Sequence, residues 1–182
     1  MSEPTSPTMS QSISPTVRRA DAGAGDVPAL DTLNQVVQQL HADAIPAIFK
    51  QPLPGGATAF LTDALQRDEV VVFVAEVGDA IVGYLFAEEN HRLAGAFTHD
   101  SHVLYVHHIA VDDRYRRLGV GRLLLEAADT WAHDHGLTDV RLDHWAFNDD
   151  AHEFFSGLGF VVDNVRMSRP VSDPGRGRFG DA

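Results

Sequence analysis

One stretch of the chain, residues 103–125, constrains the fold more than any other part of the sequence. Its first part, Val103 to Val111, is a mostly apolar run with several β-branched or aromatic residues, which predicts a strand. Asp112 and Asp113 end that run, and a loop rich in arginine and glycine follows. From Val120 onward the residues favour a helix, because apolar side chains recur at helical spacing. The stretch therefore predicts a strand, a tight loop and an amphipathic helix, in that order.

The loop in the middle of this stretch has the composition of an anion-binding site. Gly119 and Gly121 let the backbone turn sharply and approach a bulky ligand closely. The first backbone N–H groups of the helix that follows have no partners inside the helix, and their dipoles favour a negative charge. Arg116, Arg117 and Arg122 add positive charge, so the loop is predicted to hold a phosphate. For the loop alone, a solvated turn with incidental arginines is the alternative.

The residues from Arg116 to Gly121 fit the pattern R-x-x-G-x-G, which differs from the dinucleotide and P-loop patterns. This pattern resembles the acyl-CoA pyrophosphate loop of the GCN5-related N-acetyltransferase (GNAT) family. Two other segments resemble the same family in the right order, Ile109 to Asp112 before the loop and Asn148 to Phe160 after it. The resemblance covers residues 17–171. It implies an α/β (α+β) fold with a mixed, mostly antiparallel central sheet of about seven strands and helices on both faces.

The resemblance also implies which residues bind acetyl-CoA, the acyl donor. Backbone N–H groups of the loop would hold the pyrophosphate, and the exposed backbone of the preceding strand would pair with the pantetheine arm and polarise the thioester carbonyl. Asn148 would contact the pantetheine arm, and Phe155 would pack beside the sulfur. The complete set expected to bind the donor is Ile109, Ala110, Val111, Arg116, Arg117, Leu118, Gly119, Val120, Gly121, Arg122, Asn148 and Phe155.

The candidate catalytic base lies in the strand before the loop. Because side chains alternate along a strand, Tyr105 and His107 are expected on one face and His108 on the other. The two histidines are therefore not expected to act together unless a bulge intervenes. The family often places its base on the face represented here by residues 105 and 107, so His107 is the expected base and Tyr105 its support. The alternative is that either histidine is a partly buried residue without a chemical role.

The sequence departs from the family pattern at Phe155. The family usually has a tyrosine there, whose hydroxyl protonates the leaving CoA thiolate. A phenylalanine has no proton to give, which puts the usual general acid in doubt but not the binding of CoA. A thiol with a pKa of about 8.5 is already a fair leaving group near neutral pH. Water or Tyr105 would then supply the proton.

The predicted activity is direct transfer of an acetyl group from acetyl-CoA to a primary amine in a ternary complex. The chain has no cysteine to carry the acyl group, which disfavours a covalent intermediate. Two alternatives stay open. One is a weakly active or silent acyl-CoA-binding sensor or interaction module, which Phe155 favours, and the other is a protein N-terminal or lysine acetyltransferase. The sequence leaves open the acceptor, the choice between acetyl and a longer acyl group, and the choice between a monomer and a homodimer.

Composition limits the other partners of the chain. The formal net charge over 182 residues is −12, so nucleic acid is not an expected partner. Ten histidines are scattered without metal-ligand spacing, so no metal site is expected. The absence of a long apolar run and of a hydrophobic signal core predicts a cytoplasmic protein that does not cross a membrane. Residues 1–16 and 172–182 are polar, with almost no apolar content, and are predicted to be flexible tails of a domain at 17–171.

The remaining elements are predicted from their local patterns. Asp26 is expected to cap a helix, and Asn148 is expected to cap the last helix. The helix after the arginine- and glycine-rich loop is expected to end at Gly136, in a left-handed turn. Phe60, Leu61 and Leu65 are expected to form the buried side of a second, shorter helix. Gly83, inside a strand, indicates a bulge or a close backbone approach. Further strands and helices are expected at residues 17–20, 57–66, 70–76, 80–88, 140–147, 148–158, 160–162 and 165–167. The strands at 70–76 and 80–88 are expected to form an antiparallel hairpin, and a loop is expected from Asn90 to Ser101.

Overall fold

The computed structural model describes residues 14–169 of the chain. These residues form two compact units, with the boundary between Phe147 and Asn148. The flexible tails predicted at residues 1–16 and 172–182 lie almost wholly outside the described residues and remain predictions. Thr16, the last residue of the predicted N-terminal tail, already belongs to the first strand.

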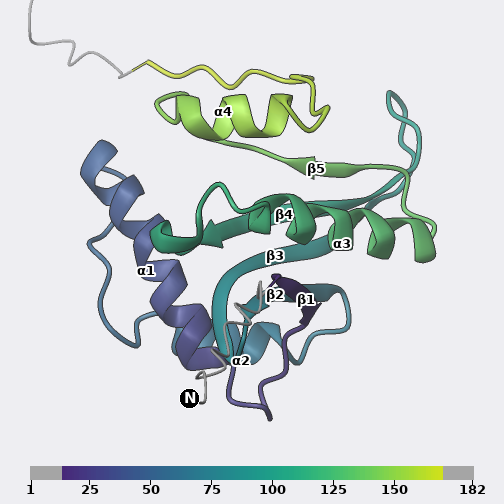
Figure 1. The fold of residues 1–182 in the computed structure, drawn as a ribbon. Helices are drawn as coiled ribbons and strands as arrows, with labels where there is room; N and C mark the ends of the chain where they lie inside the picture. The colour runs from purple at the N-terminus through teal and green to yellow at the C-terminus, as the bar shows by residue number, and fades with distance from the viewer. Residues whose placement is uncertain (1–13, 170–182) are drawn as a thin grey trace, which may run out of the picture. The chain divides into compact units, whose positions relative to one another are not determined.

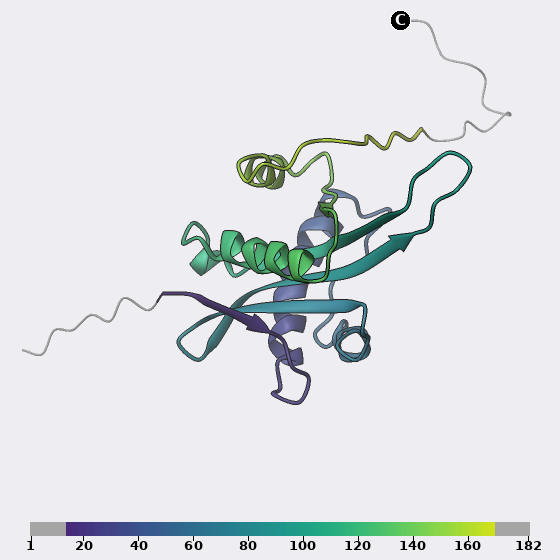
Figure 2. The same ribbon diagram turned by 90° about the vertical axis from the view of Figure 1, so that its right-hand side faces the viewer.

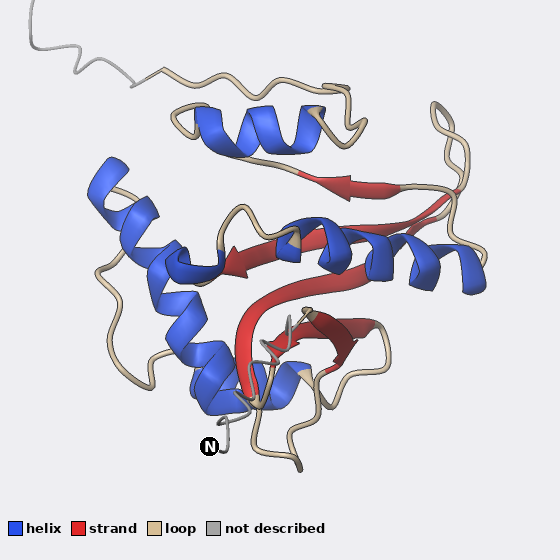
Figure 3. Ribbon diagram, in the orientation of Figure 1, coloured by secondary structure: helices blue, strands red, loops and turns tan. Residues whose placement is uncertain are grey.

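The first unit contains five strands and three α-helices (Figures 1 and 3). In chain order they are β1 (Thr16–Arg19), α1 (Val27–Ala44), α2 (Thr58–Ala64), β2 (Val70–Val77), β3 (Ala80–Arg92), β4 (Ser101–Val111), the short 3-10 helix η1 (Asp113–Tyr115), α3 (Val120–Asp134) and β5 (Val140–Leu142). The second unit contains helix α4 (Asp149–Ser156). The strand, loop and helix predicted for residues 103–125 are all present.

The five strands form one mixed sheet in the order β1-β2-β3-β4-β5. All neighbours are antiparallel except β4 and β5, which are parallel. The mostly antiparallel sheet predicted from the sequence is therefore confirmed. Within residues 14–169 it has five strands instead of about seven, because residues 160–162 and 165–167 are not in strands. An apolar pattern favours a strand, but a strand also needs a partner edge, and the local sequence does not specify one.

Strand β5 is much shorter than the strand predicted at residues 140–147. Its pairing with β4 ends where Val106 meets Leu142, one residue before an irregularity in β4. A strand that bends away can no longer offer hydrogen-bond partners in register. The segment that follows Leu142 therefore leaves the sheet, and beyond Val106 no strand within residues 14–169 pairs with β4 on that side.

Strands β3 and β4 continue past the rest of the sheet as a two-stranded arm (Figure 2). The pairing of β2 with β3 begins at Val70 and Glu88, whereas β3 and β4 stay paired as far as Arg92 and Ser101. The predicted loop from Asn90 to Ser101 is therefore shorter than expected, because both of its ends belong to strands.

Helices cover both faces of the sheet, as predicted. On one face, α1 and α2 contribute Leu30 and Leu61 to an apolar core with Tyr84 and Phe86 of β3. On the other face α3 packs against β3, where Val120 and Leu124 approach the backbone of Gly83. The sheet is therefore buried between two apolar layers, each of which depends on alternation along β3.

Asp26 precedes α1 but does not cap it with its side chain. Its carboxylate accepts two hydrogen bonds from the guanidinium of Arg18, at 2.7 and 2.9 Å, and one from the backbone N–H of Asp21. The Arg18 hydrogen bonds are the main reason that the pKa of Asp26 lies below its ordinary value. The helix begins directly after Asp26, as predicted, but Asp26 forms no side-chain cap because a bidentate, charge-assisted pair with Arg18 of β1 takes up the carboxylate.

Helix α2 buries Leu61 and Ala64, which are three residues apart. Leu65 is only partly buried and Phe60 is 49% exposed, so the prediction that Phe60 is a core residue is wrong. A helix of seven residues has a narrow buried face, and Phe60 lies at its rim, with its ring 5.5 Å from that of Phe86.

Two predictions from single glycines are confirmed. Helix α3 ends in a turn at Gly136, whose φ is +67°, and the N–H of Leu137 donates to the carbonyl of Ala132 as in a Schellman motif. Gly83 has both features that its position indicated. The register of β2 and β3 shifts beside it, and an added Cβ would lie 2.9 Å from the carbonyl oxygen of Ala110.

The close approach at Gly83 predicts the effect of adding one methyl group. We expect Gly83→Ala to lower the free energy of unfolding by about 1–3 kcal/mol, the range for overpacking a core. Gly95→Ala is the matched control, because a Cβ there would meet only the hydroxyl of Thr98, at 3.7 Å. Urea unfolding of both variants tests the prediction. Equal stabilities of the two variants would contradict it.

Candidate active site

Strand β4 contains a β-bulge at His107. The register pairs Ala87 with Val106 and Phe86 with His108, so no residue of β3 is paired with His107. An extra residue of this kind shifts the alternation of the side chains that follow it. The condition under which the two histidines were expected to share a face is therefore met.

The bulge gathers three side chains of β4 on the face that α1 and α2 cover. Glu88 and Phe86 lie two residues apart on β3 and therefore share a face, and their register partners are Tyr105 and His108. The ring of His107 lies 5.4 Å from that of Phe86, and the ring of His108 lies 5.7 Å from it. The prediction that His107 and His108 occupy opposite faces is wrong, because simple alternation assumes an unbroken ladder.

The bulge also determines which backbone groups of β4 are unpaired. The N–H of Asp112 donates to the carbonyl of Val82, so the N–H groups of His108 and Ala110 point toward β3 as well. The N–H groups of Ile109 and Val111 then point to the opposite edge. Among the described residues no strand pairs with that edge beyond Val106, so Ile109 and Val111 offer free hydrogen-bonding groups there.

The loop after β4 has the backbone form of an anion-binding nest. Arg117 has a φ of +66°, the only positive value for a non-glycine residue among residues 14–169, and Gly119 has a φ of +82°. Successive N–H groups in such conformations turn toward one concave side. Helix α3 begins at Val120 without a side-chain cap, so its first N–H groups add to that side.

Of the remaining residues in this segment, some are buried against the sheet and others are exposed to solvent. Val120 is buried against β3 and fixes the start of α3. Leu118 is exposed, and Arg116 pairs with Asp113 at 2.8 Å. Gly121 and Arg122 lie in the first turn of α3. The sequence predicted that this segment would be a tight loop leading into a helix, and that prediction is confirmed.

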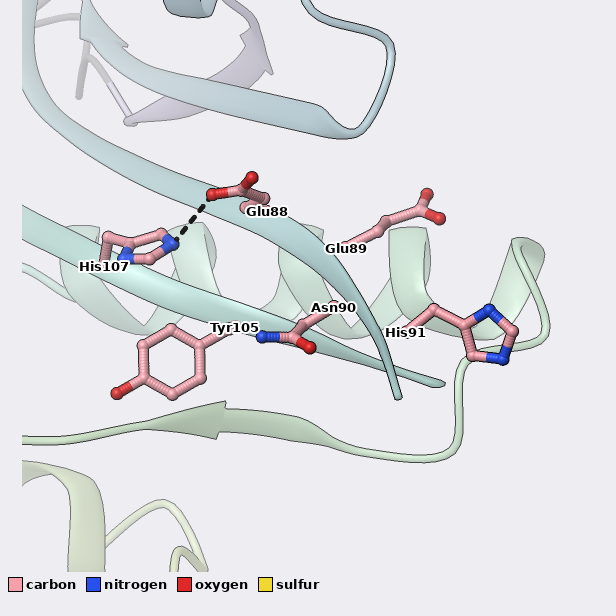
Figure 4. Close-up of a pocket in the computed structure, with 6 residues that line it drawn as sticks. All are labelled: Glu88, Glu89, Asn90, His91, Tyr105 and His107. Carbon is pink, nitrogen blue, oxygen red and sulfur yellow. Dashed lines mark ion pairs between the residues drawn. The ribbon is translucent and has the colours of Figure 1, made fainter. Parts of the chain in front are cut away.

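His107 lies at one end of a polar cleft of about 330 Å³ (Figure 4). The residues that line the cleft are Glu88, Glu89, Asn90, His91, Tyr105 and His107. The Nε2 atom of His107 lies 3.2 Å from a carboxylate oxygen of Glu88, and the ring of Tyr105 lies 5.0 Å from the imidazole. Two carboxylates in one cleft suit a cationic ligand.

Glu88 is a site residue that sequence reasoning missed. It lies on β3, nineteen positions before His107, and is brought to it by the register of the β3–β4 pair. Arg67 forms an ion pair with the other carboxylate oxygen of Glu88 and a second ion pair with Glu69. The expected hairpin partner of β3 was β2, so nothing in the local pattern indicated a link between Glu88 and β4.

His108 lies deeper on the same face, beside a buried tyrosine. Its Nδ1 atom lies 3.4 Å from the hydroxyl of Tyr84, and that hydroxyl accepts a hydrogen bond from the side-chain amide of Asn34. The pKa of His108 is lowered to about 4, mainly by burial and to a smaller extent by the nearby His107 and His41. His108 is therefore a neutral imidazole at pH 7. Burial likewise raises the pKa of Tyr84 to about 12.

His41, which lies near His108, belongs to a group of four aromatic rings. The ring of His41 stacks on Phe49 at 4.8 Å and meets the edge of Phe147 at 6.1 Å. Phe49 also contacts Trp145, at 5.2 Å. The group joins α1, the link between α1 and α2, and the segment after β5. Trp145 is 38% exposed, so it is not fully packed in a core.

In the second unit, the cap predicted at Asn148 is confirmed. The side chain of Asn148 accepts a hydrogen bond from the N–H of Ala151, which makes it the N-cap of α4. Within this unit the ring of Phe155 contacts those of Phe154 and Phe160. The helix ends at Ser156, earlier than expected. The donor-binding roles of Asn148 and Phe155 remain predictions.

Residues 14–169 contain neither a candidate metal site nor a candidate membrane-spanning helix. In that range no three histidine, cysteine or acidic residues are grouped so that they could bind a metal ion. The helices there are all too short or too polar to cross a membrane.

Comparison with known proteins identifies the family. The model of the "Acetyltransferase (GNAT) family" matches residues 37–160, from within α1 to just beyond α4. The chain belongs to the GNAT family. The bulged strand, the nest-like loop and the uncapped start of α3 all lie within the matched region of this GNAT chain.

Two curated relatives carry acetyltransferase names. The uncharacterized N-acetyltransferase YesJ of Bacillus subtilis is 30% identical over 103 residues, which are 55% of this chain and 57% of the relative. An N-alpha-acetyltransferase of Sulfurisphaera tokodaii is 31% identical over 107 residues, which are 56% of this chain and 62% of the relative. The chain thus matches only about three fifths of the length of each.

A solved structure shares the fold. The aminoglycoside N-acetyltransferase AAC(6')-Iy, solved in complex with CoA, has a TM-score of 0.71 to this chain at 18% identity. The match covers 90% of this chain and 99% of that chain. At this identity the likeness concerns the fold alone, and it agrees with the α/β architecture described above.

The low pKa of His108 predicts a pH dependence of stability. The unfolded residue has a pKa near 6.5 and the folded residue about 4, so the unfolded state binds more protons between these values. The free energy of unfolding should therefore fall by about 2–3 kcal/mol through this group alone as the pH drops from 7 to 4.5. Urea unfolding at both pH values measures the fall. His108→Gln should remove that part of it, and an equal fall in the variant would contradict the prediction.

Proposed function

We propose that the chain is an N-acetyltransferase that moves an acetyl group from acetyl-CoA directly to a primary amine. The observation that carries this proposal is the bulge at His107. It leaves one edge of β4 unpaired just before a nest-like loop and, on the neighbouring face, places an imidazole in an acidic cleft. Acyl transfer to an amine needs an edge that binds the acyl donor, a loop that binds its pyrophosphate and a base that deprotonates the amine, and β4 brings these three together.

The donor would lie along the free edge of β4. The N–H groups from Arg117 to Arg122 would bind the pyrophosphate, because the positive φ values at Arg117 and Gly119 turn them toward one side. The N–H groups of Ile109 and Val111 would pair with the pantetheine arm and polarise the thioester carbonyl. Membership of the GNAT family and the CoA complex of a protein with the same fold support this arrangement.

His107 would act as the general base toward the acceptor. The ammonium of the acceptor loses one proton to His107, and the freed electron pair forms a bond with the carbonyl carbon. The C–S bond breaks with its electron pair on sulfur, the new amide nitrogen loses a second proton, and the CoA thiolate takes up a proton. The net reaction releases one proton to solvent. The carboxylates of Glu88 and Glu89 favour a cationic acceptor in the cleft.

Two observations favour the two alternative functions, a silent acyl-CoA-binding module and a protein acetyltransferase. Phe155 cannot protonate the thiolate, which favours a weakly active or silent acyl-CoA-binding module, unless water or Tyr105 supplies the proton. The name of the Sulfurisphaera tokodaii relative favours a protein N-terminus as the acceptor, and a lysine side chain would present the same chemistry. We favour the enzyme because His107 lies in an open cleft and not in the core.

Release of free CoA in the presence of a panel of small amines, peptide N-termini and lysine peptides tests the proposal. We expect at least one amine to drive release, and His107→Ala to lower kcat about 10²-fold or more, as loss of a general base does. The KM for acetyl-CoA should change little, because His107 does not hold the donor. His102→Ala is the matched control, since His102 lies on the same strand outside the cleft and should leave kcat unchanged.

Two negative results would reject different parts of the proposal. If acetyl-CoA raises the melting temperature but no amine yields CoA, the binding-module alternative is correct. An unchanged kcat in His107→Ala would reject His107 as the base.

A further inference from the structure

We propose that Glu88 is a positioning residue for His107, holding the imidazole with its hydrogen on Nε2 so that Nδ1 takes the proton from the acceptor. This inference rests on the proposed function, because it assigns a role within the same cleft. Neither the sequence pattern nor the family likeness points to Glu88.

The geometry begins with one carboxylate that lies between a guanidinium and an imidazole. One oxygen of Glu88 pairs with the guanidinium of Arg67, and the other lies 3.2 Å from Nε2 of His107 (Figure 4). The side chains of Glu88 and His107 are 28% and 37% exposed, so the charges are only partly screened by water. The imidazole also contacts the rings of Phe86 and Tyr105, which restrict its rotation.

The tautomer of His107 follows from the charge of its neighbour. As the partner of Arg67, Glu88 is a carboxylate with no proton to donate. A lone pair on Nε2 would face that negative charge at 3.2 Å and be repelled, whereas a hydrogen on Nε2 is attracted. The lone pair of the neutral ring therefore lies on Nδ1, on the side of the ring away from Glu88 (Figure 4).

Glu88 also lies beside the base after the proton transfer. When Nδ1 accepts the proton of the acceptor ammonium, His107 becomes an imidazolium 3.2 Å from a carboxylate. The proton leaves the acceptor nitrogen with no electrons, no bond to His107 other than N–H forms, and Glu88 keeps its charge throughout. Arg67 holds the second oxygen of Glu88 and so fixes the direction of the first.

Because Arg67 binds one oxygen of Glu88, substitutions at these two residues are expected to change the tautomer of His107 in opposite directions. In Glu88→Gln the single amide oxygen should turn to Arg67, so that the amide NH2 faces His107 and donates to Nε2. The neutral imidazole should then carry its hydrogen on Nδ1, the reverse of the wild type. In the double variant Arg67→Met/Glu88→Gln the oxygen is released and can accept from Nε2–H, which should restore the first tautomer.

The ¹⁵N chemical shifts of the His107 ring, measured without any substrate, report the tautomer directly. We expect hydrogen on Nε2 in the wild type, on Nδ1 in Glu88→Gln, and largely on Nε2 again in the double variant. The matched control is Glu89→Gln, which alters the carboxylate that lies 3.3 Å from Nε2 of His102 and should leave the His107 signals unchanged. Hydrogen on Nε2 in Glu88→Gln would overturn the proposal.

Turnover provides the second readout. We expect kcat to fall about 10-fold or more in Glu88→Gln, with the KM for acetyl-CoA unchanged, and to recover in part in the double variant. A reversed tautomer with no turnover in any variant would leave the role of Glu88 standing and count against the proposed function. An unchanged kcat together with a reversed tautomer would overturn the inference that Nδ1 is the accepting atom.

Discussion

The site depends on one extra residue in β4. Without His107 as a bulge, the ladder between β3 and β4 would run unbroken, and His108 would face the same side as Val106. The bulge changes two things at once. It brings a second set of side chains to the face that Glu88 occupies, and it turns the N–H groups of Ile109 and Val111 toward the edge that β5 has left. Side-chain chemistry and backbone donors are thereby set by the same irregularity.

The rest of the first unit holds that irregularity in place. Tyr84 and Phe86 anchor β3 in the core with α1 and α2, and the absence of a side chain at Gly83 lets β4 and α3 approach closely. His108 adds a half-buried, neutral imidazole beside Tyr84, so the bulge has a fixed inner side and an open outer side. The open side is the cleft with Glu88, which belongs to the proposed chemistry.

Much of this could be predicted from sequence where the signal is local. The R-x-x-G-x-G loop, the turn at Gly136 and the cap at Asn148 depend on neighbouring residues, and each is present. The errors arise where distant segments compete. The carboxylate of Asp26, which was expected to cap a helix, pairs with Arg18 of β1 instead. The alternation of side chains around His107 fails because a bulge depends on the partner strand. Glu88 was missed for the same reason, and the number of strands also depends on partners that pattern alone does not supply.

The most direct test of this account is amide hydrogen exchange in β4, with and without saturating acetyl-CoA. The amides of Leu104 and Val106 lie where β5 is paired and should be protected in both states. Those of Ile109 and Val111 should exchange fast in the free protein and slow markedly when acetyl-CoA binds, because the donor takes the place of the missing strand. Fast exchange of both amides in the presence of bound acetyl-CoA would contradict the claim that the free edge of β4 receives the donor.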